Sequence, residues 1–139
     1  MSAWRRRASE VFPERVTDRA AKLSATAFFA ALAFDLRAVY AGAREEPDLA
    51  DRIFAFVEWS LRPGQGSALR RAAVDGLLLH LPNVAEGRRD VAVRVRPTLF
   101  AELEPRYRSA LPLEAYAALI AEVERVRYTG SDVNDREHR

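Results

Sequence analysis

Between positions 48 and 82 the apolar residues recur every three or four positions, which is the spacing of an amphipathic helix. The first of two such runs places on one helical face Leu49, Ala50, Ile53, Phe54, Phe56, Val57 and Leu61. The second run covers 67–81, and between Ala72 and Leu81 its only polar residues are Asp75 and His80. A proline and two glycines within Arg62–Ser67 separate the runs. The pattern predicts a central hairpin of two helices.

A long apolar run also precedes this hairpin. Leu23–Tyr40 contains only four polar residues, so we expect one helix from 16 to 41 that is buried on most sides. Gly42 is expected to cap its C-terminus. Asp48 and Ser67 precede or begin the two hairpin helices, and side chains of their type accept hydrogen bonds from the first helical N–H groups. We therefore expect both to act as N-caps.

Positions 84–96 are consistent with two structures. Val91, Val93 and Val95 alternate with Ala92, Arg94 and Arg96, which is the period of a strand. The flanking pattern is helical and a strand would have no partner, so a short helix that ends before Pro97 is the alternative. Whether 88–96 forms a strand or a helix stays open at this point.

Prolines divide the C-terminal part of the chain. Pro97 suits the first turn of a helix that reaches about Glu104, where Pro105 would kink or stop it. Pro112 precedes the last expected helix, Leu113 to Tyr128, and Gly130 would end it. The inner stripe of that helix is expected to consist of Tyr116, Leu119, Ile120 and Val123.

These elements predict an all-α fold, a single compact domain of five or six helices in an irregular bundle. The helical domain should span 16–130, and a chain of 139 residues is long enough to bury a hydrophobic core. Residues 1–15 are expected to form a basic arm or a short helix. Residues 131–139 are expected to form a flexible polar tail.

Trp59 departs from the pattern of its helix. It falls about 140° from the middle of the apolar face, among the charged residues. One interpretation is that it packs against a neighbouring helix or lies under an arginine. The other is that it binds a partner protein, because tryptophan and arginine are enriched at interface hot spots.

Acidic residues precede Trp59 in the same helix and in the loop before it. They are Glu45, Glu46, Asp48 and Asp51. Negative charge at a helix N-terminus is stabilised by the helix dipole, which is a structural explanation. The alternative is an acidic patch that binds a basic partner. With Trp59 and Arg62, these four residues form the predicted partner-binding surface.

Charge and composition add a second hypothesis. The formal net charge is only +2, yet Lys22 is the single lysine among 22 basic residues, a bias typical of GC-rich bacterial genomes. Arginines that could contact phosphate groups are Arg88, Arg89, Arg94 and Arg96. Arginine-mediated nucleic-acid binding is therefore the alternative function. The absence of cysteine suits a reducing cytoplasm, and the ten-residue apolar run Ala25–Phe34 is too short to cross a bilayer.

The residues offer little for catalysis. The chain has two histidines, no cysteine and no spacing typical of metal ligands. We therefore expect no catalytic site, no metal site and no cofactor. An enzyme would have to bring Asp35, Asp75 and His80 into one pocket. Because a carboxylate in an apolar helix needs a partner, we expect instead that the two aspartates form salt bridges, for which the candidate partners are Arg37, Arg70 and Arg71.

Three segments carry a family resemblance: Arg52–Glu58, the Ala72–Leu81 helix, and Phe100–Pro105. Over about residues 20–110 the chain resembles a class of small uncharacterised bacterial helical proteins, some of which are thought to be immunity proteins of polymorphic toxin systems. Trp59 stands where that class would have an acidic or polar residue. The resemblance implies a non-enzymatic protein that binds another protein.

The sequence thus predicts a cytoplasmic, non-enzymatic module whose partner is another protein, of the immunity type or a regulatory kind. A homodimer through Trp59 is a further expectation. No association with a membrane is expected.

Overall fold

The computed structural model describes residues 2–137, and their side chains as far as Tyr128. In this part of the chain every regular element is a helix, which confirms the predicted all-α class. The sequence pattern predicted one helical domain over 16–130, whereas the structure divides between His80 and Leu81 into two compact units. We call them unit 1 and unit 2, and each is described by itself.

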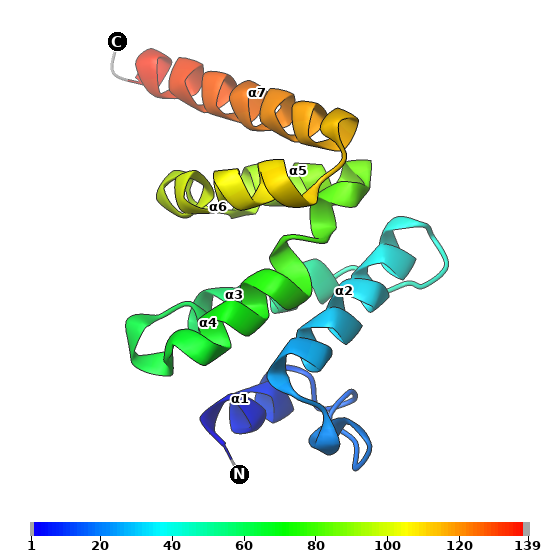
Figure 1. The fold of residues 1–139 in the computed structure, drawn as a ribbon. Helices are drawn as coiled ribbons and strands as arrows, with labels where there is room; N and C mark the ends of the chain where they lie inside the picture. Colours follow the sequence, from blue (N-terminus) through cyan, green and yellow to red (C-terminus); the bar gives the residue numbers. More distant parts are fainter. Residues whose placement is uncertain (1, 138–139) are drawn as a thin grey trace. The chain divides into compact units, whose positions relative to one another are not determined.

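Unit 1 combines four α-helices with short 3₁₀ and π segments (Figure 1). The bounds are Ala3–Val11 (α1), Ala20–Lys22 (η1, 3₁₀), Ala25–Tyr40 (α2), Leu49–Ser60 (α3), Pro63–Gln65 (η2, 3₁₀), Ser67–Ala73 (α4) and Val74–Leu78 (η3, π). The predicted hairpin is present as α3 and α4, which contact each other, and α2 contacts both α4 and η3.

Aromatic rings form the core of unit 1. The Phe56 ring of α3 lies in the middle, with its centroid 5.7 Å from that of Phe12, which follows α1. The same centroid lies 5.2 Å from Phe29 and 6.1 Å from Phe28, both on α2. Burying a ring of this size contributes on the order of 2–3 kcal/mol. Of the two expectations for residues 1–15, the structure contains the short helix, and Ala8 and Phe12 join it to the core.

The start of α2 differs from the prediction. The helix begins at Ala25 and not near 16, because Ser24 is its N-cap: the Ser24 Oγ accepts a hydrogen bond from the Ala27 N–H at 3.1 Å. The segment before it contains only η1. The helix is also less enclosed than its composition suggested, since Phe34 is 73% exposed within the chain.

The end of α2 confirms the prediction for Gly42. This residue has φ of 76°, in the left-handed region that glycine adopts without strain. Its N–H donates to the Val39 carbonyl at 3.0 Å, and the Ala43 N–H donates to the Ala38 carbonyl at 2.9 Å. These two bonds are the Schellman motif, which satisfies carbonyls at the helix end.

Of the two N-caps expected for the hairpin, Asp48 is in the predicted position without a capping bond, and Ser67 is not the N-cap. Asp48 occupies the N-cap position of α3, but its side chain makes no capping hydrogen bond and its carboxylate lies 3.3 Å from Arg52 Nε. Gly66, with φ of 92°, is the N-cap of α4, and Ser67 is already the first helical residue. The Asp48 carboxylate therefore pairs with Arg52 and not with the helical N–H groups, and a turn glycine occupies the N-cap position of α4.

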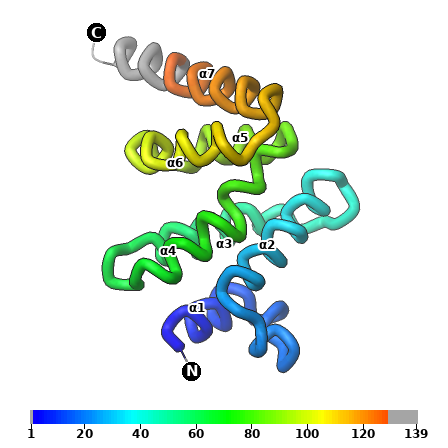
Figure 2. The backbone as a smooth tube through the Cα atoms, viewed as in Figure 1, coloured from blue at the N-terminus to red at the C-terminus, as the bar shows by residue number. Residues whose placement is uncertain are grey.

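Unit 2 contains a 3₁₀ turn and three α-helices, whose backbone Figure 2 follows from α5 through α6 into α7. The bounds are Leu81–Asn83 (η4), Ala85–Arg94 (α5), Pro97–Ala110 (α6) and Leu113–Glu137 (α7). The helix α5 contacts both η4 and α7. Gly87 brings α5 against η4 so closely that an added Cβ would lie 1.8 Å from the Leu81 carbonyl oxygen.

The strand considered for 88–96 is wrong, because α5 covers most of it. Val91 is fully buried and Val95 is 9% exposed, while Val93 between them is 60% exposed. Burial therefore repeats after four residues, as on a helix, and not after two, as on a strand. The alternation of valines in the sequence does not correspond to alternating faces.

Pro97, Pro105 and Gly130 were each expected to start or end a helix, and only Pro97 does so. Pro97 is in the first turn of α6, as predicted, but Pro105 lies inside this helix, which continues to Ala110. Pro105 and Ala101 are both exposed, so the carbonyl that loses its hydrogen-bond donor belongs to the solvent face. Gly130 does not end α7, whose backbone continues to Glu137.

The inner stripe predicted for α7 is largely confirmed. Leu119 and Val123 are buried, and Tyr116 and Ile120 are half-buried.

Candidate interaction surfaces

Seven charged side chains meet in unit 1, where the segment after α1, the helix α2 and the start of α3 come together. They are Glu14, Arg15, Asp35, Arg44, Glu46, Asp48 and Arg52, and we call them the ion-pair cluster. Arg15 lies at its centre, with Nη2 2.6 Å from Glu46 Oε1 and Nε 2.9 Å from Asp35 Oδ2. Arg52 joins Glu14 at 2.7 Å and Glu46 at 3.2 Å.

The cluster is partly shielded from solvent. The side chain of Arg15 is 12% exposed, and those of Asp35 and Glu46 are each 23% exposed. Burial alone would lower the pKa of Arg15, but the hydrogen bonds and charges of Glu46 and Asp35 raise its pKa above the ordinary value. The guanidinium therefore stays charged and holds three chain segments together.

Two residues of the predicted partner-binding surface belong to this cluster. Glu46 and Asp48 are ion-paired within it, whereas Glu45 and Asp51 are exposed beside it. These two residues and the cluster together contain six carboxylates and three guanidinium groups, a formal charge of −3 in a chain whose net charge is +2. We call Glu45, Asp48 and Asp51, the exposed carboxylates just before α3 and in its first turn, the acidic surface.

Trp59 lies half-buried within unit 1. Its ring is stacked on Phe56, with centroids 6.0 Å apart and an interplanar angle of 11°. The Arg7 guanidinium of α1 lies 5.8 Å from the Trp59 centroid, a cation–π contact. Of the two interpretations, a position under an arginine of a neighbouring helix matches its surroundings, while its ring contact is with Phe56 of its own helix.

The six residues predicted to bind a partner do not form one patch. At about 1.5 Å per residue, Trp59 lies roughly 12 Å along the helix from Asp51. Arg62 is exposed one turn further, at the other end of α3 from Glu45 and Glu46. The structure therefore separates an acidic N-terminal end of the surface from an arginine at its C-terminal end.

Two of the three residues considered for catalysis, Asp35 and His80, make contacts that hold parts of unit 1 together. Asp35 is ion-paired as expected, but with Arg15 and Arg44 and not with the arginines proposed from spacing. His80 is exposed at the end of unit 1, where its carbonyl accepts a hydrogen bond from Arg37 at 3.3 Å. Among the described residues, no group of His, Asp and Glu side chains is arranged to hold a metal ion.

A cleft of about 280 Å³ opens in unit 2 between the end of α5, the start of α6 and α7. Its guanidinium groups come from Arg94, Arg96 and Arg127, and we call it the arginine cleft. The apolar part of its lining includes Val91, Val93, Val95, Phe100, Val123 and Val126. Two of the four arginines predicted to contact phosphate are therefore brought together here.

The other two predicted arginines lie outside the cleft lining. Arg88 is half-buried and donates to the Pro82 carbonyl at 3.1 Å. Arg89 is exposed, and the charges of both contribute to the lowered pKa of Glu122, for which the Arg125 hydrogen bond is the largest cause. No sequence pattern pointed to Arg127, because it follows Arg96 by 31 positions and joins it only through the packing of α7.

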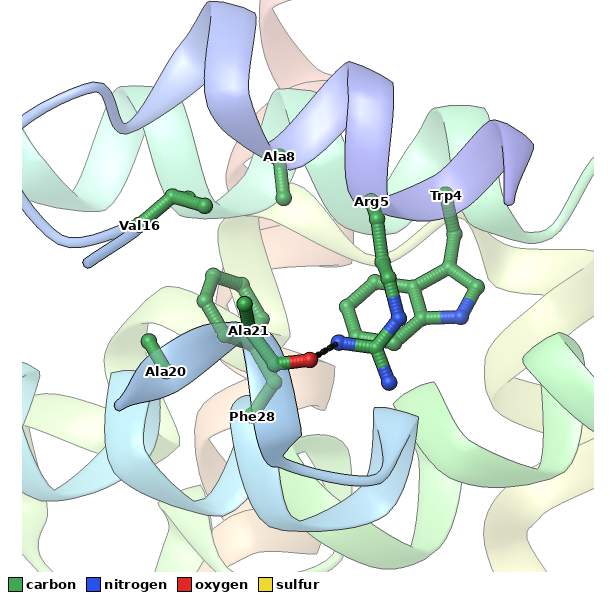
Figure 3. Close-up of a pocket in the computed structure, with 7 residues that line it drawn as sticks. All are labelled: Trp4, Arg5, Ala8, Val16, Ala20, Ala21 and Phe28. Carbon is green, nitrogen blue, oxygen red and sulfur yellow. Dashed lines mark hydrogen bonds between the residues drawn. The ribbon is translucent and has the colours of Figure 1, made fainter. Parts of the chain in front are cut away.

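A second, much smaller cavity of about 30 Å³ lies under α1 (Figure 3). Trp4, Ala8 and Phe28 are among its lining residues, and the Arg5 guanidinium reaches across it to the Ala21 carbonyl. Arg5 also donates to the Leu23 carbonyl at 2.6 Å. A space of this size holds a water molecule or two at most. Arg5 therefore ties α1 to the segment before α2.

Among the described helices, none combines the length and the hydropathy that crossing a lipid bilayer requires. The chain matches no protein-family model, no curated protein and no solved structure. The resemblance to small bacterial helical proteins therefore stays a hypothesis.

Proposed function

We propose that the protein is a non-enzymatic binding module that uses the acidic surface of unit 1 to bind a basic segment of another protein. The observation that carries the proposal is the group of three exposed carboxylates, Glu45, Asp48 and Asp51, just before and at the start of α3. Complementary charge raises association rates and selects against partners of the wrong sign.

The construction of the surface supports the same proposal. The ion-pair cluster and the Phe56 core hold α3 in place, so its carboxylates are presented on a rigid element. Rigid presentation lowers the entropy that is lost on binding. The arginine pairing that involves Asp35 and Glu46 also gives these carboxylates a structural role in place of a catalytic one.

The test is a charge reversal with a matched control. We expect the Glu45→Lys/Asp51→Lys variant to lose a partner that the wild type captures from extracts of the source organism. The control, Glu114→Lys/Glu124→Lys, makes the same charge change on exposed residues of α7 and should retain that partner. Binding of the purified partner by calorimetry must show the same difference, and equal binding by both variants would refute the acidic surface.

An immunity-type role is the specific form of this proposal that the family resemblance suggests. If the captured partner is a toxin, coexpression with the wild type should restore growth, and coexpression with Glu45→Lys/Asp51→Lys should not. Self-association is tested separately, by sedimentation of the wild type and Trp59→Phe. A homodimer through Trp59 requires a dimer that the substitution weakens.

The alternative, arginine-mediated binding of nucleic acid, is supported by the three guanidinium groups of the arginine cleft. Its measurement is affinity for single-stranded and duplex oligonucleotides across salt concentrations. Phosphate contacts require that log K falls with log salt with a slope of about −0.7 to −0.9 per contact. A flat dependence, or no binding, would eliminate this alternative.

A further inference from the structure

The solvent side of α2 is apolar along its whole length. The side of this helix that faces the core is formed by the buried Phe28, Phe29, Leu32, Ala33 and Leu36. At about 100° per residue, the opposite side consists of Ala27, Ala30, Ala31, Phe34, Ala38 and Ala41, and we call it the Phe34 face. Phe34 is 73% exposed, and the charged residues of the helix, Asp35 and Arg37, lie at the two edges of the face. A surface helix usually has charged residues on this side, so the Phe34 face indicates an interaction site.

The Phe34 face contains both a projecting side chain and a hollow that fits it. Phe34 is the one large residue of the face, and the positions three, four and seven residues before it are alanines. Their small side chains leave a hollow on the same side of the helix. An interface with two-fold symmetry uses the same patch on both subunits, so that patch must be self-complementary. Two antiparallel copies of α2 meet this condition, because each Phe34 ring can lie in the alanine hollow of the other copy.

Charge at the two ends of α2 favours the antiparallel direction. Residues 17–22, before the helix, contain one acidic residue and two exposed cations, Arg19 and Lys22. Residues 43–48, after the helix, contain one arginine and three carboxylates, of which Glu45 is exposed. The two segments adjoin opposite ends of α2 (Figure 1). Antiparallel pairing brings each basic segment toward the acidic segment of the other copy, whereas parallel pairing would place like charges together.

We propose that the Phe34 face binds a second copy of this chain, by antiparallel packing of the two α2 helices. The area of the face sets the strength of the contact. The 16 residues of α2 extend about 24 Å, and a width of roughly 10 Å gives about 240 Å² from each copy. A standard interface buries about 800 Å² per partner, so we expect a weak dimer with Kd on the order of 100 µM.

This dimer is separate from the other contacts considered for the chain. It does not rest on the proposed function, and its test uses the purified chain alone, without the partner that the acidic surface would bind. It also differs from a homodimer through Trp59, because Trp59 lies on α3. Trp59→Phe should therefore leave the dimer unchanged.

The test is sedimentation equilibrium of the full chain between about 10 µM and 1 mM. We expect the average mass to rise from 15.6 kDa toward twice that value. Phe34→Glu should weaken self-association at least about tenfold, because it removes the ring and places a carboxylate in an apolar contact. The control, Leu113→Glu, makes the same change at an apolar residue of unit 2 that is 81% exposed, and it should leave the dimer unchanged. Because both side chains are exposed, both variants should retain the helical circular dichroism of the wild type.

Cysteine cross-linking tests the direction of the two helices, because the chain has no cysteine of its own. When each Phe34 lies in the hollow of the other copy, the two-fold axis passes close to Ala31. Ala31→Cys should therefore form a disulfide between two copies on mild oxidation, which requires Cα atoms about 4.4–6.8 Å apart. Ala41→Cys should stay reduced, because antiparallel pairing separates the two copies of this residue by more than about 20 Å. A parallel pair would cross-link both variants.

Several results would overturn the proposal. One is an average mass that stays at the monomer value up to about 1 mM, and another is equal self-association of the wild type and Phe34→Glu. Disulfide formation by Ala41→Cys would contradict the antiparallel direction. A monomer in which the amides and side chains of the Phe34 face are protected from solvent would assign this face to another part of the same chain.

Discussion

The Arg15 guanidinium donates to Asp35 across 20 residues of sequence, with Nε 2.9 Å from Oδ2. A second nitrogen of the same group donates to Glu46, so one side chain joins the segment after α1 to α2 and to the loop before α3. Asp35, a carboxylate in an otherwise apolar helix, is thereby paired with an arginine that is distant in the sequence. This arginine lies neither on α2 nor on the hairpin of α3 and α4.

We expect Arg15→Met to lower the free energy of unfolding by about 2 kcal/mol, because it removes one partner from a shielded group of charges. Arg44 and Arg52 still contact the carboxylates, which keeps the loss below that of a fully buried pair. Urea unfolding measures it, with an unchanged m-value as the check on the transition. In the control, Arg108→Met breaks a solvent-screened pair and should lower the stability far less.

Gly87→Ala should destabilise unit 2 by about 3 kcal/mol, because the new Cβ would overlap the Leu81 carbonyl and force α5 away from η4. Gly64→Ala is the matched control, since no atom lies within 4 Å of its Cβ position. Thermal unfolding of the two variants should therefore differ clearly. Equal stability would contradict the close contact of α5 and η4.

Ser24→Ala should cost about 1 kcal/mol through loss of the α2 N-cap. Hydrogen exchange should locate the effect in the first turn of α2, at the amides of residues 25–28. Ser67→Ala provides the comparison: Ser67 makes no capping bond and alanine favours the helix interior, so little or no loss is expected. The prediction is wrong if both serines have the same effect.

Hydrogen bonds from Arg108 and then from Tyr116 lower the pKa of the Glu104 carboxyl. Because the folded-state pKa is below that of the unfolded chain, about 4.3, this carboxylate stabilises the fold above that pH. The contribution is lost as the pH falls through the folded value. Carboxyl ¹³C NMR should show the pKa of Glu104 rising in Tyr116→Phe.

The control for that titration is Tyr128→Phe, which removes the hydroxyl of an exposed tyrosine elsewhere on α7. An unchanged pKa of Glu104 in Tyr116→Phe would show that the contact between these two side chains is absent in solution.

Features that depend on neighbours in sequence could be predicted. Gly42 at the end of α2 and Pro97 at the start of α6 act as their backbone preferences require. The hairpin of α3 and α4 followed from apolar spacing. In each case the relevant contacts lie within about one helical turn, so the local pattern contains the information.

Features that depend on tertiary contacts could not be predicted in the same way. Asp35 pairs with Arg15, which is 20 positions away in the sequence and approaches it only in the folded chain. The Asp48 carboxylate pairs with Arg52 and does not cap its own helix. In α5 the alternation of valines matches the period of a strand, although the segment is a helix. Arg127 reaches the arginine cleft through the packing of α7 against α5, which no short motif encodes.

The separations in sequence that the ion-pair cluster spans have a consequence for the order of folding. Three of its hydrogen bonds join residues 20, 31 and 38 positions apart, so each of these three closes a long loop at a cost in chain entropy. The aromatic contacts of Phe56 with Phe12 and Phe29 close loops of similar length, so the core and the cluster bring the same segments together. Charged side chains can take up their paired positions only after these segments have met, so we expect loss of the cluster to speed unfolding more than it slows folding.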